Sequence, residues 1–224
     1  MADAGYDVRD YRKVAARYGA NEDLEALFRA AHEKGMRVLL DLVPGHTSIE
    51  HPWFQASQSA GRNEHSDHYI WTDSVFHKPK GYSWICGRTE RDGCAMLNFF
   101  DMQPALNYGF ARPAEPWQKS YTDPCCRQVF DAVMEVMRFW LRKGCDGFRV
   151  DMAGSLVKDD PTGEATASLW QRAQAMLRQE FPDAVLISEW SDPEKALSLA
   201  GFQGDFYLVF NGDGARSLLR EGER

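Results

Sequence analysis

Short runs of apolar residues alternate along the chain with stretches in which apolar residues recur at helical spacing. Three runs rich in Val, Leu and Ile cover residues 38–43, 147–152 and 184–190, and a fourth candidate covers 205–210. Near-continuous apolar character is typical of strands buried on both faces of a parallel sheet. We therefore predict four such strands.

Helical periodicity precedes or follows these runs. Apolar side chains recur at three- and four-residue spacing in three stretches: residues 24–31, 129–141 and 169–177. We expect the first helix to begin at Asn21 and to end at Gly35, and the second to end at Gly144. Asp192 and Pro193 are a suitable cap and first-turn residue for a short fourth helix. Strands that alternate with helices indicate a parallel α/β fold.

The alternation stops between residues 44 and 124. Aromatic residues are frequent there, and they include Trp53, Tyr69, Trp71, Tyr82, Trp84, Phe99, Phe100 and Tyr108. A loop of that length without structure is uncommon in a compact domain. We therefore predict an inserted subdomain at 44–124 between barrel parts at 1–43 and 125–224. Most of its aromatic side chains are expected to form a small core.

The length of the chain limits the architecture. A complete (β/α)8 barrel needs about 250 residues before insertions. Once the insert is set aside, the rest of the 224 residues suffices for four or five βα units of ~30 residues each. The prediction is a partial (β/α)8 TIM barrel.

Charge and hydropathy exclude some partners. The net charge is −7, acidic and basic residues are mixed, and no Lys/Arg run could follow a phosphate backbone. No apolar stretch approaches the ~20 residues of a membrane span. The first residues lack the basic patch and apolar core of a secretory signal. We expect no nucleic-acid or membrane partner and a cytoplasmic location.

The five cysteines are an odd number and lack zinc-like C-x-x-C pairs. Reduced thiols in a cytoplasmic protein are the expected state. A bridge between Cys86 and Cys94 across a loop is the open alternative.

Three of the predicted strands place polar residues at or near their carboxyl ends: Asp41 and His46, then Arg149 and Asp151, then Glu189. In barrels of this class the active site lies at the carboxyl ends of the strands. A single carboxylate there is more often structural, whereas several from successive strands indicate a site. No set of residues predicts a metal or another cofactor.

Asp151 and Glu189 are one strand–helix unit apart, so their strands are expected to be neighbours about 4.8 Å apart. Retaining glycosidases hold two carboxyls ~5–5.5 Å apart, and inverting ones ~6.5–9.5 Å. Arg149 shares a strand face with Asp151 and is expected to lower its pKa. Glu189, beside Trp190 and with no such cation in the sequence, is expected to have a raised pKa. The alternative is an Arg149–Asp151 ion pair that only orders the core.

Four ordered motifs resemble the alpha-amylase family, glycoside hydrolase family thirteen. They are GFRVD at 147–151, LISEW at 186–190, DLVPGHTS at 41–48 and DAGYDV at 3–8. HYIW at 68–71 and QPALN at 103–107 are similar to insert segments of alpha-glucosidases and trehalose-forming members. The resemblance covers essentially the whole chain.

The resemblance implies roles for these residues. Asp151 corresponds to the residue that forms the covalent glycosyl intermediate, Glu189 to the general acid/base, and Arg149 to the supporting cation. His46 and Tyr6 correspond to contacts of the sugar in the cleaved position. Asp3 corresponds to a contact of that sugar in exo-acting glucosidases, and Gln103, in the insert signature, is expected to bind substrate.

The chain also departs from the family pattern. Gly45 replaces an Asn that often binds a structural calcium, so no cofactor is predicted and calcium is the open alternative. Ala105 replaces the Asp of the insert signature. The third family carboxylate lies in an N-H-D segment, which Asn211-Gly212-Asp213 does not match. By analogy the chain covers about strands 3–6, and strands 1, 7 and 8 and the C-terminal β-domain are absent.

The predicted function of the intact protein is retaining hydrolysis of alpha-glucosidic bonds in oligo- or polysaccharides by double displacement. One alternative is an alpha-glucan transglycosylase or trehalose-type sugar isomerase, in which a sugar intercepts the same intermediate. Another, of a different class, is a non-catalytic binding or scaffold protein. Residues 1–224 alone are expected to have little activity.

Overall fold

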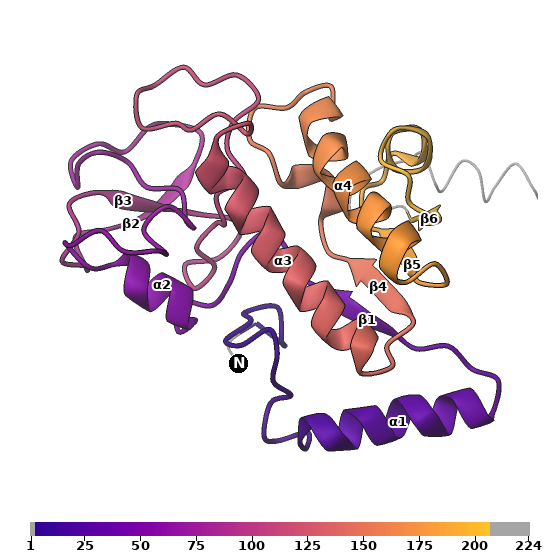
Figure 1. Cartoon of the computed structure of the whole chain (residues 1–224). Coiled ribbons are helices and arrows are strands. Elements are labelled where there is room, and N and C mark those ends of the chain that lie inside the picture. Colours follow the sequence, from indigo (N-terminus) through magenta and orange to yellow (C-terminus); the bar gives the residue numbers. More distant parts are fainter. Residues whose placement is uncertain (1–2, 207–224) are drawn as a thin grey trace, which may run out of the picture.

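The computed structural model describes residues 3–206. Its main sheet has four parallel strands in the order β1-β4-β5-β6 (Figure 1). The strands are β1 (Leu39–Leu42), β4 (Gly147–Val150), β5 (Val185–Ser188) and β6 (Gly204–Asp205). Asp41 aligns with Arg149, and Arg149 aligns with Ile187. This is the parallel α/β arrangement predicted from the alternating pattern, and it accounts for part of a barrel wall.

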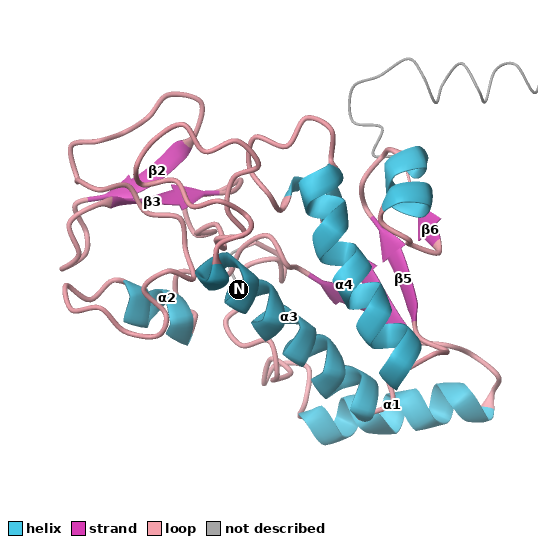
Figure 2. Ribbon diagram, turned by 45° about the horizontal axis from the view of Figure 1, so that its top comes forward, coloured by secondary structure: helices cyan, strands magenta, loops and turns pink. Residues whose placement is uncertain are grey.

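Three long helices follow or precede these strands: α1 (Asn21–Glu33), α3 (Pro124–Arg142) and α4 (Glu164–Glu180). Helices α3 and α4 lie side by side on one face of the sheet, and α1 lies beside its β1 end (Figures 1 and 2). Gly35 and Gly144 follow the ends of α1 and α3 with φ of 74° and 105°, a region that favours glycine. The predicted first and second helices are confirmed, including the glycines beyond their ends.

The core lies between the sheet and helices α3 and α4. Phe148 and Val150 are buried on β4, and Leu186 is buried on β5. They belong to one cluster with Phe130 and Trp170, whose rings are 5.5 Å apart at an interplanar angle of 82°. Each fully buried large apolar side chain contributes about 1.5–3 kcal/mol to stability. This core fixes β4 and β5 side by side.

Burial on both faces of the strands, which the apolar runs predicted, is not found in the described residues. In β4 the neighbours Phe148 and Val150 are buried, whereas Arg149 between them is only partly buried. In β1, Asp41 is exposed. Successive side chains of a strand point to opposite faces. The face opposite the helices therefore carries Asp41 and Arg149, and within residues 3–206 no element covers it as α3 and α4 cover the other face.

Two predicted elements differ in detail. The fourth apolar run begins as strand β6, and its residues 207–210 lie outside the described residues. The short helix after Asp192 is present at η2 (Glu194–Leu199), but it is a π-helix. Its Ala200 amide donates to the Lys195 carbonyl at 2.8 Å, five residues back. Wider turns of this kind are rare and usually short.

Residues 44–124 contain elements of their own: helix α2 (Pro52–Ser57) and an antiparallel pair, β2 (Ser83–Cys86) and β3 (Cys94–Leu97). Ile70, Met96, Ala105, Phe110 and Trp117 form a second buried cluster. The eight aromatic residues predicted to form a separate small core do not build this cluster, and that prediction is wrong for most of them. Tyr69, Trp71 and Tyr108 are buried in the main core, and only Trp84 packs against the second cluster. Tyr82, Phe99 and Phe100 are exposed. Figure 1 places the β2–β3 pair beside the N-terminal end of α3.

Cys86 and Cys94 form a disulfide across the turn between β2 and β3. The expectation that all five thiols are reduced is therefore wrong for this pair, and the alternative bridge is present. The pair is directly opposed in the antiparallel register, which brings the two Cα atoms within 4.4 Å. Cys125, Cys126 and Cys145 are free.

Candidate active site

Asp151 and Glu189 are the first residues after neighbouring parallel strands. Val150 of β4 aligns with Ser188 of β5, so the two acids stand at the same level of the sheet. The Asp151 amide donates to the Leu42 carbonyl at 2.8 Å, and the Glu189 amide donates to the Val150 carbonyl at 2.9 Å. Backbone pairing thus continues through both acids and fixes their positions.

The Arg149 guanidinium joins three carboxylates. Its Nη1 donates to Asp41 Oδ1 and to Asp151 Oδ1, each at 2.8 Å, and its Nη2 donates to Glu189 Oε2. The Met152 amide also donates to Glu189 Oε2 at 3.0 Å. Asp151 and Glu189 are 8% and 6% exposed. The two acids therefore lie on the same side of the sheet, around one cation.

The electrostatics of the pair differ from the sequence-based expectation. Burial raises the pKa of Asp151 to about 7, and the hydrogen bond with Glu189 and the charge of Glu189 act in the same direction. Arg149 opposes this shift without overcoming it. The predicted lowering of the Asp151 pKa is thus wrong. The expectation that Glu189 lacks a cation is also wrong, because Arg149 spans both acids. The pair can hold one proton near neutral pH.

Asp205 stabilises the backbone that follows β5 through three hydrogen bonds. It was not predicted as a site residue. Its Oδ1 accepts from the Trp190 amide at 2.9 Å and from Ser188 Oγ at 2.7 Å, and its Oδ2 accepts from the Asp192 amide at 2.9 Å. These bonds hold the backbone on both sides of Glu189. The only sequence signal was its place at the start of the fourth apolar run.

Tyr6 and Asp41 lie beside the guanidinium. The Tyr6 hydroxyl donates to Asp41 Oδ2 at 3.1 Å, and the Tyr6 ring centroid is 5.8 Å from Arg149 Cζ. Burial, followed by the charge of Asp41, raises the pKa of Tyr6. A partly exposed ring next to the two acids can present an apolar face to a bound sugar.

Asp3 and Gln103 are far apart in sequence but meet in the structure. Gln103 Nε2 donates to Asp3 Oδ2 at 2.5 Å. Gln103 Oε1 accepts from the backbone amide of Phe100 at 3.1 Å, and the backbone amide of Gln103 donates to the Phe100 carbonyl at 2.9 Å. Gln103 thus connects the N-terminal loop that carries Asp3 to the tight turn at Phe100 in the 44–124 segment. This positioning contact is additional to its predicted contact with substrate.

His46 is held as a neutral imidazole. It is 1% exposed, and burial lowers its pKa to about 4. Asn98 Nδ2 lies 3.2 Å from its Nδ1, and the Tyr6 carbonyl lies 2.9 Å from its Nε2. An amide nitrogen is a donor and a carbonyl is an acceptor, so the proton of this tautomer is on Nε2. The backbone of Tyr6 and the amide of Asn98 therefore fix the ring plane.

The surroundings of His46 do not fit a calcium ion. A Cβ at Gly45 would lie 2.7 Å from Asn98 Nδ2, so the Asn98 amide occupies the room that a side chain at 45 would need. Lys158 Nζ donates to Asn98 Oδ1 at 3.1 Å and to the backbone carbonyl of Ser155, also at 3.1 Å. A cationic side chain already uses the oxygens that a hard cation would require. Within residues 3–206 no group of three or more His, Cys, Asp or Glu side chains is arranged to hold a metal.

The sequence matches the family described as alpha amylase, catalytic domain, over residues 1–198. Trehalose synthase of a Pimelobacter species is 35% identical over 202 residues, covering 84% of this chain and 32% of the relative. Oligo-1,6-glucosidase of Heyndrickxia coagulans is 36% identical over 167 residues, covering 70% of this chain and 27% of the relative. The chain thus spans about a third of the length of the curated relatives it matches.

Solved structures give the same result. The trehalose-6-phosphate hydrolase of Bacillus licheniformis superimposes with a TM-score of 0.71 at 26% identity, covering 92% of this chain and 39% of that one. The alpha-glucosyl transfer enzyme XgtA superimposes with a TM-score of 0.74 at 25% identity, covering 100% of this chain and 48% of that one. Both the sequence and the backbone therefore lead to one family.

Proposed function

Because this chain belongs to the alpha-amylase catalytic-domain family, we propose that the whole protein is a retaining enzyme that cleaves alpha-glucosidic bonds by double displacement. The observation that carries the proposal is the Arg149 fork, which holds Asp151 and Glu189 at the ends of adjacent strands. Adjacent strand ends suit the short carboxyl separation of retaining glycosidases.

In the proposed reaction Asp151 attacks the anomeric carbon, and Glu189 protonates the leaving glycosidic oxygen. The proton that the pair holds must lie on Glu189 once the sugar is bound. Glu189 then removes a proton from water, and the hydroxyl displaces Asp151. Arg149 compensates the charge of both carboxylates, while Tyr6, His46, Asp3 and Gln103 are proposed to contact the sugar.

Asp151→Asn and Glu189→Gln in the whole protein test this assignment. Each keeps the shape of the side chain and removes the nucleophile or the acid, so we expect turnover of maltose to fall roughly 10³-fold or more. Asp159→Asn and Glu135→Gln are matched controls, because both side chains lie on the surface in ion pairs. Near-full activity of either site variant would refute the role given to that residue.

A second candidate is transfer of the glucosyl group to a sugar, as in a transglycosylase or a trehalose-type isomerase. Several of the similar proteins bear the name trehalose synthase, and one structure is of an alpha-glucosyl transfer enzyme. Chromatography of the products from maltose separates the two: glucose alone supports hydrolysis, and trehalose or longer glucans support transfer.

A non-catalytic binding protein is the rival of another class. Both predicted catalytic carboxylates are present and share one cation, which a binding role does not require. Tight binding of maltose by wild type with no turnover would favour that rival.

We also propose the finer organisation: residues 44–124 as the inserted subdomain, and an alpha-linked glucose oligo- or polysaccharide as the substrate. No helix within residues 3–206 is long and apolar enough to span a bilayer. A cytoplasmic location is proposed with one observation against it, since disulfides such as Cys86–Cys94 persist mainly in oxidising compartments.

A further inference from the structure

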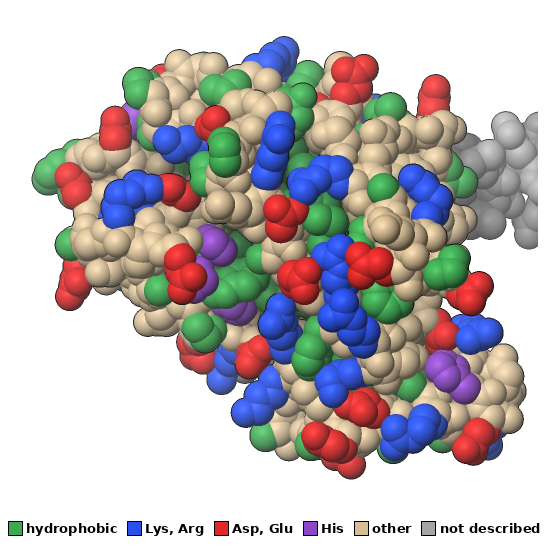
Figure 3. All heavy atoms as spheres, in the orientation of Figure 1, with side chains coloured by type: hydrophobic (Ala, Val, Ile, Leu, Met, Phe, Trp, Pro, Cys, Tyr) green, Lys and Arg blue, Asp and Glu red, His purple; other side chains and the backbone are tan. Residues whose placement is uncertain are grey.

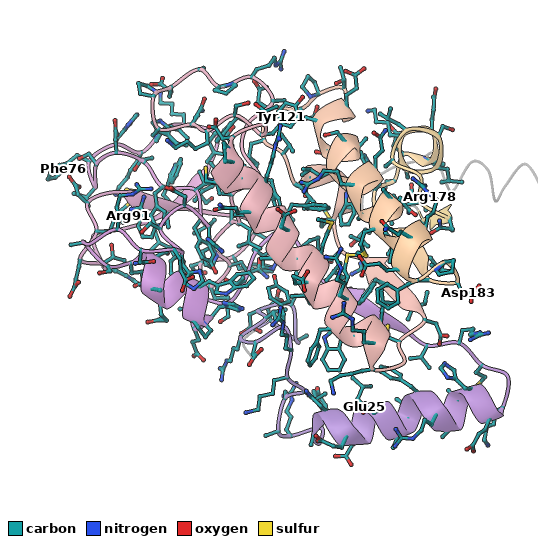
Figure 4. All side chains as sticks on the ribbon, in the orientation of Figure 1. Glu25, Phe76, Arg91, Tyr121, Arg178 and Asp183 are labelled. Atoms are coloured by element: carbon teal, nitrogen blue, oxygen red, sulfur yellow. A yellow bond between two sulfur atoms is a disulfide. The ribbon has the colours of Figure 1, made fainter. Side chains whose placement is uncertain are left out.

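A hollow of about 370 Å³ lies between the N-terminal halves of α3 and α4, and none of its lining residues belongs to the site around Asp151 and Glu189. It is lined by Tyr121 and Thr122, Arg127 of α3, and Ser168, Leu169 and Arg172 of α4. Figure 4 shows Tyr121 between the upper ends of the two helices. Its volume falls within the roughly 300–1,000 Å³ typical of small-molecule sites.

The hollow has an excess of positive charge. Arg172 donates through Nη2 to Asp131 Oδ1 at 2.5 Å, which balances one cation. Arg127 forms no ion pair with any residue in the range 3–206, and its side chain is exposed. Figure 3 shows Lys and Arg side chains together with hydrophobic ones along the upper junction of these helices. Within the described part of the chain, one of the two cations at the hollow therefore lacks an ion-pair partner.

Hydrogen-bond donors at the hollow also lack acceptors. Arg172 Nη1 is buried and has no hydrogen-bond partner among the described residues, although buried polar atoms are rarely left unpaired. The guanidinium lies over the Phe130 ring, with Cζ 5.7 Å from its centroid, which keeps the side chain on the helix surface. The Tyr121 hydroxyl makes no hydrogen bond within the described part of the chain.

We propose that this hollow binds the phosphoryl group of a small molecule. Arginine side chains bind phosphate oxygens with two parallel hydrogen bonds, and two arginines from neighbouring helices can share one tetrahedral anion. The Tyr121 hydroxyl supplies a further donor. Leu169 and the Tyr121 ring form an apolar wall on which the carbon skeleton of a sugar phosphate can lie. The proposal does not depend on the reaction proposed for the strand ends.

The test is isothermal titration of the full chain with three probes: inorganic phosphate, glucose 6-phosphate and glucose. We expect saturable binding of inorganic phosphate and of glucose 6-phosphate, and no binding of glucose at this site. Tighter binding of glucose 6-phosphate than of phosphate identifies a sugar phosphate as the ligand, and equal binding identifies the free anion. The proposal would be overturned if neither inorganic phosphate nor glucose 6-phosphate showed saturable binding.

Variants locate the site. Arg127→Ala removes an exposed, unpaired cation and is expected to weaken phosphate binding about tenfold or more. Arg178→Ala is the matched control, because it removes the same charge from an exposed position of α4 outside the hollow. Arg172→Lys keeps the charge but loses the fork, and it is also expected to weaken binding. Equal effects of Arg127→Ala and Arg178→Ala would mean nonspecific attraction and would refute the site, while thermal unfolding of each variant verifies the fold.

Discussion

One proton on the Asp151–Glu189 pair sets the expected pH dependence of the site. The Asp151 pKa is raised to about 7, so the pair is protonated below that pH and loses its proton above it. Glu189 needs this proton to act as an acid. We expect kcat/KM of the whole protein to fall about tenfold per pH unit above pH 7. A profile that stays level from pH 6 to 9 would contradict this.

The same shift has a consequence for stability. The folded chain holds the Asp151 proton more tightly than the unfolded chain, whose carboxyl titrates near 3.8. The contribution of this group is therefore fully present below about pH 4 and is lost as the pH rises to about 7. Asp151→Asn removes that pH dependence, and chemical unfolding of wild type and variant at pH 4 and 8 measures the difference.

Gly45 tests the packing around His46. Gly45→Asn would push the new Cβ to within 2.7 Å of Asn98 Nδ2, whose amide is bonded to His46 and to Lys158. We expect the free energy of unfolding to fall by about 1–3 kcal/mol, because Asn98 must leave its partners. Gly61→Asn is the control, since a Cβ there meets only Ser59 Oγ at 4.0 Å. An equal loss from both variants would show that Asn98 is not constrained.

At the residue scale, sequence motifs located the acids but not their charge state. Asp151 and Glu189 were predicted from their places near the carboxyl ends of apolar runs, and the structure brings them together. Whether Arg149 reaches one carboxylate or three depends on the conformation of its side chain and on the alignment of β1 with β4, which places Asp41 beside Arg149. Neither can be read from the sequence. Asn98, Lys158 and Asp205 were missed because each lies outside the recognised motifs, and their contacts with the site depend on how the loops fold.

At the scale of elements, the close approach of β4 to β5 depends on Gly147. Its φ is 148°, and a Cβ would lie 2.0 Å from the Val185 carbonyl oxygen. We expect Gly147→Ala to lower the free energy of unfolding by about 3 kcal/mol or more, since backbone atoms on both strands would have to shift. Gly204→Ala on β6 is the matched control, because its Cβ would make an ordinary contact of 3.7 Å with Ile187. Similar unfolding curves for both variants would refute this account.

The helices were predictable because their signals are local. Gly35 and Gly144 end α1 and α3 through the backbone freedom of one residue. The disulfide was left open because Cys86 and Cys94 are brought together by the register of β2 against β3, which spacing alone does not determine. The π form of η2 has no sequence signal of its own.

At the scale of the whole molecule, each outer strand of the described main sheet has a strand neighbour on one side only. Strand β1 pairs with β4 alone, and β6 pairs with β5 alone, so two edges of the described sheet carry unpaired backbone groups. The face with Asp41 and Arg149 is partly open. We expect the 224-residue chain alone to turn over maltose no faster than the Asp151→Asn variant of the whole protein. Robust turnover by the chain alone would overturn that expectation.

The apolar runs predicted a partial barrel with strands buried on both faces, and only the helix-covered face follows that prediction within residues 3–206. A run of Val, Leu and Ile does not reveal which neighbours a strand will have. Burial of the second face is a property of the closed sheet and not of one strand.

The three carboxylates around Arg149 also limit how this site can change during evolution. A lysine at position 149 has one ammonium group and cannot fork between Asp41, Asp151 and Glu189. Loss of the cation at this position would leave three carboxylates facing one another until compensating changes arose at several positions. We expect lineages to inherit the four residues as a block, or to lose the chemistry altogether.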